Sequence, residues 1–289
     1  MKELLIISGK GGAGKTSLTA ALASLASPCV LADCDVDAAD LHLLLKPEIQ
    51  QSVPFYSGVM PEIIYDRCVD CYRCYSLCRY GAISILTTHP RFIAGACEGC
   101  GVCADQCPEE AIVMRDRHCG EWYVSSTPCG TMVHAKLLPG AENSGKLVSA
   151  VRQAAKAVAE AEGRSLLLSD GPPGIGCPVI SAMTGVDAAL IVTEPSVSGM
   201  HDMKRIAELA RNFEVDFQVV INKADINPEK SDEIAAFCQR NGIGIAGTIP
   251  YDPLFTTALR QGRTIMDYPE SAPAQAIRRI WQHIQDKIQ

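Results

Sequence analysis

The chain has 289 residues, of which 47% are hydrophobic and 20% charged, and its formal net charge is −7. This composition is typical of a globular protein large enough for one α/β domain and a smaller second one, and its acidic balance argues against general nucleic-acid binding. No run of 18 or more apolar residues indicates a membrane span and no charged-then-apolar segment indicates export, so we expect a cytoplasmic protein.

The first two predicted elements are a buried strand at Leu4–Ile7 and a helix at Leu18–Ala26, joined by a glycine-rich loop. The loop has the P-loop spacing Gly-x4-Gly-Lys-Thr, in which backbone N–H groups surround phosphate oxygens. Lys15 is expected to contact the β- and γ-phosphates, and the Thr16 hydroxyl is expected to bind Mg²⁺. The predicted nucleotide-binding loop consists of Gly9, Lys10, Gly11, Gly12, Ala13, Gly14, Lys15, Thr16 and Ser17.

A second predicted strand, Cys29–Asp33, runs into a segment rich in aspartate. Carboxylates at the end of a strand beside a P-loop lie where a metal ion or an attacking water needs them, which makes Asp35 a candidate catalytic residue and Mg²⁺ ligand. The alternative is that Asp35 or Asp37 caps the start of a helix. The roles of Asp33, Asp37 and Asp40 stay open.

Eight of the 14 cysteines form two motifs with one spacing, Cys-x2-Cys-x2-Cys-x3-Cys. Each cysteine of the first motif recurs 29 residues later, as Cys68 does at Cys97, and an Ala-Ile pair recurs with them, so this region is an internal duplication. Closely spaced thiolates favour iron–sulfur clusters over zinc, which usually takes its ligands as separated pairs. Since the chain also carries a nucleotide loop, we interpret these cysteines as metal ligands in a reducing compartment and not as disulfides.

The double motif resembles the bacterial ferredoxin that holds two [4Fe–4S] clusters. The resemblance implies that each cluster takes three cysteines from one motif and the fourth from the other. One ligand set would be Cys68, Cys71, Cys74 and Cys107, and the other Cys97, Cys100, Cys103 and Cys78. The chain departs from that family at Arg79, which stands where a proline would follow the fourth cysteine.

The charges around the two motifs differ. The first is flanked by Arg67, Arg73 and Arg79, and the second by Glu98, Asp105, Glu109 and Glu110. Cations near a cluster favour its reduced form, so these charges could separate the two reduction potentials. The alternative, which we favour, is an ordinary solvated surface.

Beyond the motifs, strands are predicted at Glu121–Val124 and Thr131–Leu137. The next segment, from Gly140 to Lys146, imitates the Gly-x4-Gly-Lys spacing but continues with Leu147, which has no hydroxyl for Mg²⁺. We therefore predict no second nucleotide loop here, but the start of a helix that continues through Ala161.

An apolar strand at 165–169 ends in Asp170, a Walker B pattern in which the aspartate holds Mg²⁺ through water. The resemblance of the loop after Asp170 to switch II of the MinD-like ATPases implies that Gly174 presents its N–H to the γ-phosphate. The chain then alternates again between predicted strands and a helix, at Val186–Val192, Gly199–Arg211, Val215–Ile221 and Ile243–Ile249.

The tetrapeptide Asn222-Lys223-Ala224-Asp225 follows one of these strands and matches the element by which GTPases recognise guanine. Pro250 and Asp252 follow the last strand and are placed to close over a base. We predict that Asn222, Asp225, Pro250 and Asp252 bind the base.

Lys10 is a second lysine just after the first glycine of the loop, and this resembles the deviant Walker A loop of the MinD/ParA ATPases and of the nitrogenase iron protein. In that family the lysine reaches the phosphates held by the other subunit of a nucleotide-sandwich dimer. The resemblance implies catalytic roles for Lys10, Lys15, Asp35 and Asp170. It also implies that Asn222 contacts adenine, which favours ATP over GTP.

Cys177 lies as far beyond Asp170 as a cysteine that ligates the subunit-bridging cluster of the nitrogenase iron protein. A third cluster at a dimer interface would need a second cysteine, for which Cys119 and Cys129 are candidates. We expect the alternative, a buried free thiol.

The last predicted helix, Ala272–Gln289, carries apolar residues at helical spacing. They are Ile277, Ile280, Trp281, Ile284 and Ile288. Some MinD-type ATPases bind membranes with such a helix, but Arg278, Arg279 and Lys287 supply only modest basic charge here, so we expect this helix to dock on the ATPase core.

Strands alternating with helices predict an α/β fold with a doubly wound, mostly parallel sheet. We assign residues 1–59 and 119–289 to a P-loop ATPase domain and residues 60–118 to an inserted α+β ferredoxin-like domain. The order of the motifs resembles a MinD-superfamily ATPase with an inserted ferredoxin domain, a relative of the nitrogenase iron protein and the Mrp-type iron–sulfur carriers.

The resemblance implies ATP, Mg²⁺ and two [4Fe–4S] clusters as cofactors, and a homodimer or a heterodimer with a related ATPase. It implies ATP hydrolysis coupled to electron transfer, with a redox partner that the sequence does not identify. One alternative is a carrier that hands clusters to an iron–sulfur client, and another is a positional ATPase with redox-sensing clusters. Neither nucleic acid nor a membrane is expected as a partner.

Overall fold

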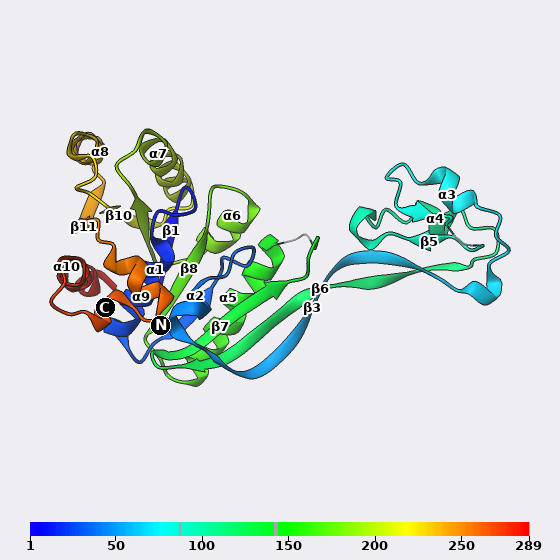
Figure 1. Ribbon diagram of the computed structural model, residues 1–289, viewed down its shortest axis with the longest axis horizontal. Helices are drawn as coiled ribbons and strands as arrows, with labels where there is room; N and C mark the ends of the chain where they lie inside the picture. Colours follow the sequence, from blue (N-terminus) through cyan, green and yellow to red (C-terminus); the bar gives the residue numbers. More distant parts are fainter. Residues whose placement is uncertain (87, 142–143, 289) are drawn as a thin grey trace. The chain divides into compact units, whose positions relative to one another are not determined.

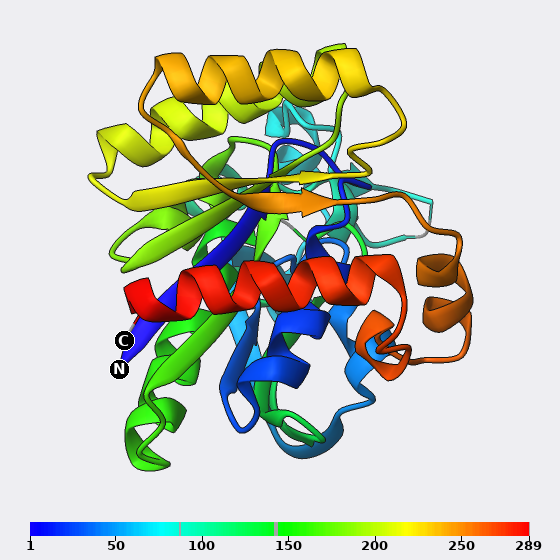
Figure 2. The same ribbon diagram turned by 90° about the vertical axis from the view of Figure 1, so that its left-hand side faces the viewer.

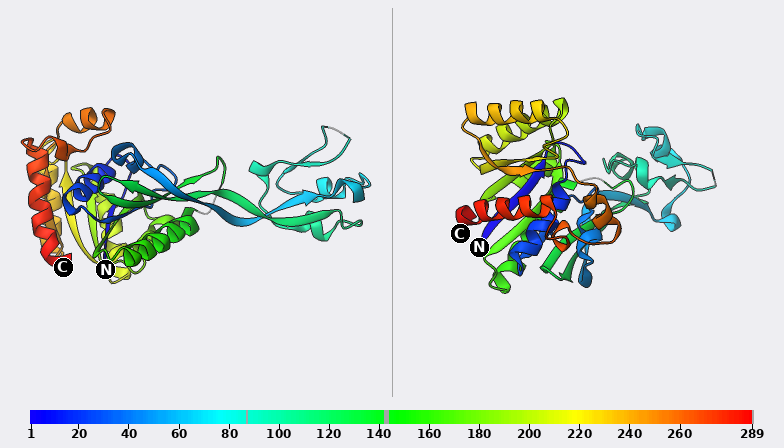
Figure 3. Two further views of the ribbon diagram at one scale, coloured as in Figure 1. Left: turned by 90° about the horizontal axis from the view of Figure 1, so that it is seen from below. Right: turned by 60° about the vertical axis from the view of Figure 1, so that its left-hand side comes forward.

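The computed structural model describes residues 1–86, 88–141 and 144–288 (Figure 1). The chain forms two compact units. The larger unit consists of Met1–Val53, Trp122–Lys136 and Ser144–Gln289, and the smaller unit of Pro54–Glu121 and Leu137–Asn143. The predicted insert, residues 60–118, falls within the smaller unit, and both chain ends belong to the larger one (Figure 3).

A nine-stranded sheet in the described residues has the order β11-β10-β9-β1-β8-β2-β7-β6-β3. The pairings of β1 with β8 and β9, of β10 with β9 and β11, and of β2 with β7 and β8 are parallel, which confirms the predicted mostly parallel α/β sheet. The strands are β1 Lys2–Ser8, β2 Val30–Asp33, β3 Glu48–Ile63, β6 Ile112–Thr127, β7 Gly130–Leu137, β8 Leu166–Pro173, β9 Ala188–Thr193, β10 Asp216–Asn222 and β11 Gly244–Ile249.

Helices of the larger unit cover the sheet because the central strands are apolar on both faces. Leu4 and Ile6 of β1 belong to a core with α1 and α10, which lie side by side (Figure 2), while Leu5 and Ile7 are buried on the opposite face. The helices are α1 Lys15–Ala26, α2 Leu41–Leu45, α5 Ser144–Ala161, α6 Cys177–Met183, α7 Val197–Asn212, α8 Pro228–Arg240, α9 Leu254–Arg260 and α10 Ala272–Ile288.

The apolar stripe of α10 faces this core, as predicted. Ile277, Ile280 and Ile284 are almost completely buried, and α10 contacts α1 and β11. Trp281 packs against the same core, whereas the side chain of Ile288 and residue Gln289 lie outside the described part of the chain. No helix that the structure describes is long and apolar enough to span a bilayer.

The sequence failed to predict most of β3 and the first half of β6. Residues 50–65 show no clear alternation of apolar and polar side chains, yet β3 runs without interruption from Glu48 to Ile63. Most side chains of β3 are exposed, so the apolar-polar alternation that reveals a half-buried strand is missing. β6 likewise begins at Ile112, well before the predicted start at Glu121.

The two halves of the smaller unit make equivalent backbone hydrogen bonds. The N–H of Ile64 donates to the carbonyl of Ala111 (2.7 Å), and the N–H of Ile93 donates to that of Ala82 (2.8 Å). Ile93 and Ala111 are the counterparts of Ile64 and Ala82 at the 29-residue offset, so each half bonds to the other in the same way. The elements are η1 Tyr65–Arg67, α3 Arg73–Leu77, β4 Ile83–Ser84, β5 Arg91–Phe92, η2 Ala94–Ala96 and α4 Val102–Asp105.

Left-handed backbone positions also recur at this offset. Positive φ angles occur at Asp70, Tyr72 and Gly81 in the first half and at the counterparts Gly99, Gly101 and Glu110 in the second. A non-glycine residue rarely adopts this conformation without a reason. The two halves therefore share one backbone design although their side chains differ.

A buried ionic cluster ties β1 to α5. Glu3 is only 1% exposed, and its carboxylate accepts two hydrogen bonds from Arg152 (2.8 and 2.7 Å) and one from Ser169 (2.8 Å). The ammonium of Lys156 lies 2.9 Å from the same carboxylate. Burial alone would raise the pKa of Glu3, but these cations and donors outweigh it and lower the pKa below 4.5.

Replacing Arg152 with Met should destabilise the larger unit by about 3–5 kcal/mol at neutral pH, because the change leaves the Glu3 carboxylate buried with its bidentate partner lost. Urea unfolding followed by circular dichroism measures this loss. Since the folded-state pKa of Glu3 is lowered, its contribution is present above the unfolded-state pKa and is lost as pH falls through the folded one. The penalty should therefore shrink in acid.

The matched control is Lys156→Met, which removes a partly exposed cation from the same carboxylate and should cost about 1 kcal/mol or less. Equal losses in the two variants would contradict the assignment of Arg152 as the main partner of Glu3.

Candidate functional site

The predicted P-loop connects β1 to α1, and Gly14 sits at the N-cap of that helix with a φ of 93°. A Cβ atom on Gly14 would collide with the side-chain amide of Asn222. Glycine is therefore required here for two reasons, the left-handed backbone and the close approach of Asn222.

Asp170 lies at the centre of a buried polar cluster below this loop. Lys15 Nζ is 2.9 Å from Asp170 Oδ2 and 3.4 Å from Asp35 Oδ2. The hydroxyl of Thr16 donates to Asp170 Oδ2 (2.8 Å) and that of Thr19 to Oδ1 (2.7 Å). The structure thus brings together the predicted residues Lys15, Thr16, Asp35 and Asp170.

The carboxylates determine the charge of Lys15. Burial alone would lower the pKa of Lys15, but the carboxylates of Asp170, Asp35 and Asp33 outweigh burial and raise it. Burial is also the largest cause of the raised pKa of Asp35, with Asp170 adding to it. Lys15 therefore remains a cation that is available to an anionic ligand.

Asp33 adds a third carboxylate whose role the sequence left open. It is fully buried, and its Oδ1 accepts a hydrogen bond from the N–H of Asp35 (3.2 Å). Within the described residues its Oδ2 has no hydrogen-bond partner. Burial and the nearby Asp170 raise the pKa of Asp33.

The oxygen donors of this cluster fit Mg²⁺. Magnesium takes oxygen ligands from carboxylates, hydroxyls, phosphates and water. Thr16, Asp35 and Asp170 supply such oxygens, and the unpartnered oxygen of Asp33 adds one suited to accept from a metal-bound water. The helix-cap alternative for Asp35 does not apply, because α2 begins at Leu41.

Gly174 follows β8 in a left-handed conformation with a φ of 92°. Its N–H, which was predicted to face the γ-phosphate, donates to the carbonyl of Ser8 at the end of β1 (3.1 Å). Contact with a phosphate would require this hydrogen bond to break. The loop after β8 is thus attached directly to the strand that carries the P-loop.

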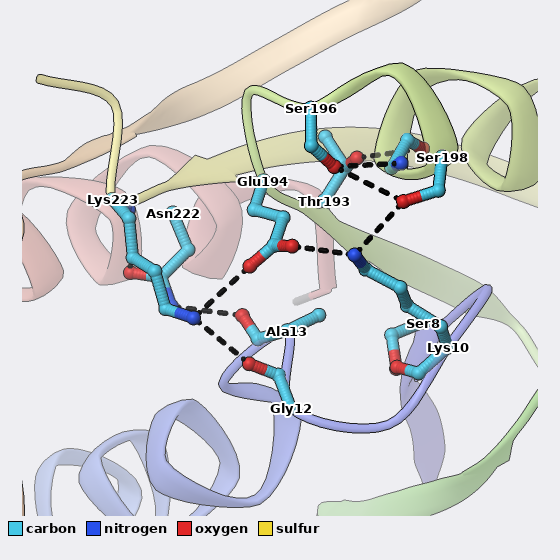
Figure 4. A network of polar contacts seen from close by, with 11 residues as sticks. Ser8, Lys10, Gly12, Ala13, Thr193, Glu194, Ser196, Ser198, Asn222 and Lys223 are labelled. Atoms are coloured by element: carbon cyan, nitrogen blue, oxygen red, sulfur yellow. Dashed lines mark hydrogen bonds and ion pairs between the residues drawn. The ribbon is translucent and has the colours of Figure 1, made fainter. Parts of the chain in front are cut away.

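The Asn-Lys-x-Asp element also bonds to the P-loop. Asn222 Nδ2 donates to the carbonyl of Ala13 (2.8 Å), and Lys223 Nζ donates to that of Gly12 (3.0 Å; Figure 4). Asp225 Oδ1 accepts from the N–H of Tyr251 (2.6 Å), which holds the neighbouring loop beside the element.

The loop that was predicted to close over the base contains Pro250 and Asp252. Asp252 accepts from the N–H of Leu254 at the start of α9 (2.8 Å), so its carboxylate caps this helix. In the structure Asn222, Asp225 and Asp252 all hold backbone segments around the site.

Glu194 joins two lysines at the mouth of the loop (Figure 4). One carboxylate oxygen pairs with Lys10 Nζ (2.5 Å) and the other with Lys223 Nζ (3.0 Å), while Lys10 Nζ also donates to the hydroxyl of Ser198 (3.0 Å). Burial alone would raise the pKa of Glu194, but the two lysines outweigh it and lower the pKa. This bridge holds Lys10 against its own subunit.

Sequence reasoning missed Glu194, Thr19 and Ser198 because no spacing motif marks them. The available signal for Glu194 was its place directly after β9, at the edge of the sheet where the P-loop also lies. Thr19 lies four residues after Lys15 and so occupies the same face of α1.

Two cavities in the described part of the smaller unit are each lined by four of the predicted cysteine ligands. A cavity of about 230 Å³ is lined by Cys78, Cys97, Cys100 and Cys103, and one of about 20 Å³ by Cys68, Cys71, Cys74 and Cys107. Each set combines three cysteines of one motif with the fourth of the other, as the ferredoxin resemblance implied.

Backbone donors point at sulfur atoms around both cavities. The N–H of Ala82 donates to Cys78 Sγ (3.4 Å), and its counterpart Ala111 donates to Cys107 Sγ (3.3 Å). No three His, Cys, Asp or Glu side chains in the described residues converge on a single metal-ion position. Four thiols with N–H groups aimed at sulfur are the ligand chemistry of a multinuclear iron–sulfur cluster, and the larger cavity has room for one, whereas the smaller cavity has room for about one water molecule.

Cys177 is exposed at the start of α6, so the expectation of a buried thiol was wrong. Exposure was hard to predict because Cys177 follows a glycine-rich turn and not a strand with a clear buried pattern. The two suggested partners are both buried, and Cys119 Sγ donates to the carbonyl of Ser57 (3.2 Å).

Replacing Glu194 with Gln should strengthen the binding of a nucleoside triphosphate, because it removes the anion that competes with phosphate for Lys10. The three groups carry a net charge of +1 (two lysines and one glutamate), and the variant raises this to +2. A partly exposed pair contributes about 1 kcal/mol or less, so the expected gain is a factor of about 2 to 5 in Kd.

Fluorescence titration with a labelled ATP analogue measures this change. Glu233→Gln is the matched control, since it makes the same charge change at a surface residue paired with Lys230. Unchanged or weaker binding by the Glu194 variant would contradict this function of the bridge.

The comparisons with known proteins agree with the geometry of the larger unit. The model of the CobQ/CobB/MinD/ParA nucleotide binding domain matches residues 4–265. An uncharacterised protein of Methanocaldococcus jannaschii, MJ0578, is 34% identical over 228 residues, which cover 78% of this chain and 79% of the relative.

More distant relatives share the fold. The septum site-determining protein MinD of Synechocystis is 23% identical, with 96% of this chain and 86% of that protein covered. The structure of MinD with Mg-ADP from Pyrococcus horikoshii matches with a TM-score of 0.59 at 17% identity, covering 99% of this chain and 96% of that one. The family matched by the domain model is one of P-loop ATPases, and the matched residues contain the central strands, the P-loop and the acidic cluster described above. This chain belongs to the CobQ/CobB/MinD/ParA family of P-loop ATPases.

Proposed function

We propose that this ATPase is an iron–sulfur protein in which nucleotide-dependent rearrangement of a dimer is coupled to electron transfer through two [4Fe–4S] clusters. One observation carries the proposal: eight cysteines are sorted into two sets of four, each around its own cavity, in a chain that also has a P-loop site. In this proposal residues 60–118 are a ferredoxin-like insert in the ATPase chain.

The cysteine sets suit resident clusters. When bound, a [4Fe–4S] cluster accepts and releases single electrons. Cys68, Cys71, Cys74 and Cys107 would hold one cluster and Cys97, Cys100, Cys103 and Cys78 the other. The backbone N–H groups that point at Cys78 and Cys107 would stabilise negative charge on their sulfur atoms. A reducing, cytoplasmic compartment would keep these thiols free of disulfides.

The nucleotide site has the groups that ATP hydrolysis requires. In the proposal Lys15 neutralises the phosphates, Thr16 and Asp170 hold Mg²⁺, and Asp35 orients the attacking water. Lys10 would leave Glu194 and reach the phosphates held by the partner subunit, in a homodimer or a heterodimer with a related ATPase. The base element then takes adenine through Asn222.

The proposed coupling can be expressed as a shift in the reduction potential of a cluster. Coupling free energies between two sites are typically about 1–3 kcal/mol. For a one-electron centre, about 1 kcal/mol corresponds to roughly 40 mV. Nucleotide binding is thus strong enough to change a reduction potential measurably.

The cysteine sets predict the outcome of paired substitutions. A Cys78→Ala/Cys97→Ala protein should retain one intact [4Fe–4S] cluster, about four irons, because both cysteines belong to one set. A Cys68→Ala/Cys78→Ala protein should retain none, because each cluster loses a ligand. Iron analysis and EPR of the reduced, reconstituted proteins distinguish the two. The reverse result would indicate that each motif holds its own cluster, and absence of iron in the unmodified protein would overturn the proposed function.

Nucleotide should shift the reduction potential of at least one cluster by tens of millivolts, on the order of the coupling energies above. An anaerobic redox titration followed by EPR measures the potentials without nucleotide, with ADP and with a slowly hydrolysed ATP analogue. Lys15→Ala is the control, since loss of its ammonium removes the main cation for the phosphates.

Potentials that do not respond to nucleotide would contradict the coupling. Transfer of clusters to an apo client would then favour the carrier function. The positional alternative is not favoured by α10, whose apolar stripe is buried against the core.

A further inference from the structure

Two segments of the smaller unit occupy equivalent positions in the duplication, but their side chains differ in size and are opposite in charge. We call residues 72–80 the tyrosine–arginine segment and residues 101–109 the acidic segment; they are related by the 29-residue offset. The substitutions between them, in that order, are Tyr72 to Gly101, Arg73 to Val102, Tyr75 to Ala104, Ser76 to Asp105, Leu77 to Gln106, Arg79 to Pro108 and Tyr80 to Glu109.

The fold does not require the large side chains of the tyrosine–arginine segment. Both segments begin with a left-handed residue, at Tyr72 and Gly101, and continue into a short helix, α3 or α4. The acidic segment forms this backbone with small and acidic residues. Since the second copy forms the same backbone without them, backbone geometry does not explain the aromatic and basic residues of the first copy.

These side chains are on the surface. Tyr75 is 49% exposed, and Leu77 (41%) and Tyr80 (37%) are exposed where they line the larger cysteine cavity. The guanidinium of Arg79 lies over the ring of Tyr80, 4.8 Å from its centre, and donates to the tyrosine hydroxyl (2.6 Å). Arg73 donates to Gln106 (3.0 Å). Arg79 is thus held beside an exposed aromatic ring, and Arg73 is held by Gln106 of the acidic segment.

This composition is that of a protein interface. Tyrosine and arginine are enriched in interface cores and among the residues that contribute most to binding, because they bury a large area at low entropic cost. Exposed Tyr75 beside Arg73 and Arg79 in the sequence therefore favours an interface over the ordinary solvated surface that the charges alone suggested.

The charges of the two segments select different partners. Arg73 and Arg79 give the tyrosine–arginine segment a formal charge of +2, with no acidic residue in it. Asp105 and Glu109 give the acidic segment −2, with no basic residue. Asp70, just outside the first segment, is bonded to His89 (2.8 Å). Complementary potential guides association, so an acidic protein surface fits the first segment and is repelled by the second.

The tyrosine–arginine segment also reaches both cysteine cavities. It contains Cys74, which lines the smaller cavity, and Cys78, which lines the larger one. Tyr72 and Arg73 line the smaller cavity, and Leu77, Arg79 and Tyr80 line the larger. A protein bound here would lie next to both sets of thiols.

We propose that residues 72–80 form the docking surface for an acidic electron-carrier protein. The inference rests on the proposed iron–sulfur function and adds the chemistry and position of its protein partner. The acidic segment, with its formal charge of −2, is not the binding site for this partner in the proposal.

The test measures binding of the reconstituted, full-length protein to an acidic flavodoxin in its oxidised form, by titration calorimetry at low ionic strength. The unmodified protein should bind, and added salt should weaken the complex. An Arg73→Val/Tyr75→Ala protein carries the residues of its own second copy and should bind at least about tenfold more weakly, as expected for loss of a central anchor.

Asp105→Ser/Glu109→Tyr is the matched control, made by the reverse exchange in the acidic segment, and should bind flavodoxin at least as well as the unmodified protein. Tyr75→Ala/Arg79→Gln is a second variant of the docking surface. Iron content and far-UV circular dichroism establish that all variants are folded and loaded. Basic cytochrome c serves as a probe of opposite charge, and its binding should not depend on residues 73 and 75.

Several results would overturn the proposal: no binding of flavodoxin by the unmodified protein, equal binding by both exchange variants, or loss of cytochrome c binding in the Arg73 variant. Sedimentation velocity tests a second copy of this chain as the occupant; self-association that the Arg73 variant abolishes would replace the acidic carrier by that copy. Failure to load iron would instead refute the proposed function, so the two failures are distinguishable.

Discussion

The buried carboxylate of Asp170 is the interaction on which the nucleotide site depends. It lies within the strand β8, and it accepts hydrogen bonds from Lys15, Thr16 and Thr19 of the helix α1. A charge in this position is tolerated only because a cation and two hydroxyls surround it. The same contacts hold α1 against the central strands, so they stabilise the fold and also position Lys15 and Thr16 at the P-loop.

Around this centre the loops of the site are joined mainly through backbone carbonyls of the P-loop region. The carbonyl of Ser8 accepts a hydrogen bond from Gly174 in the loop after β8, and the carbonyls of Gly12 and Ala13 accept from Lys223 and Asn222 of the base element. Glu194 adds a bridge between Lys10 and Lys223. Because these contacts meet at one loop, a ligand that moves the loop must affect the base element and the loop after β8 together.

Much of this arrangement could be predicted from sequence, because it depends on short-range patterns. The P-loop spacing, the apolar run before Asp170 and each cysteine motif lie within about ten residues, and the recurrence of the motif 29 residues later is also visible in the sequence. Glu194 and the full length of β3 could not be predicted, for two physical reasons. A bridge between Lys10 and Lys223 forms only in the folded chain, and a strand with exposed side chains on both faces has no apolar alternation to reveal it.

The hydrogen bond between Gly174 and Ser8 has a further consequence. A single N–H can satisfy one strong acceptor at a time, so the carbonyl of Ser8 and a terminal phosphate exclude each other at Gly174. The diphosphate product lacks that phosphate and leaves the carbonyl uncontested. In the proposed mechanism the hydrogen bond between Gly174 and Ser8 would therefore break when a triphosphate binds and form again after hydrolysis, which would link the loop after β8 to the number of bound phosphates.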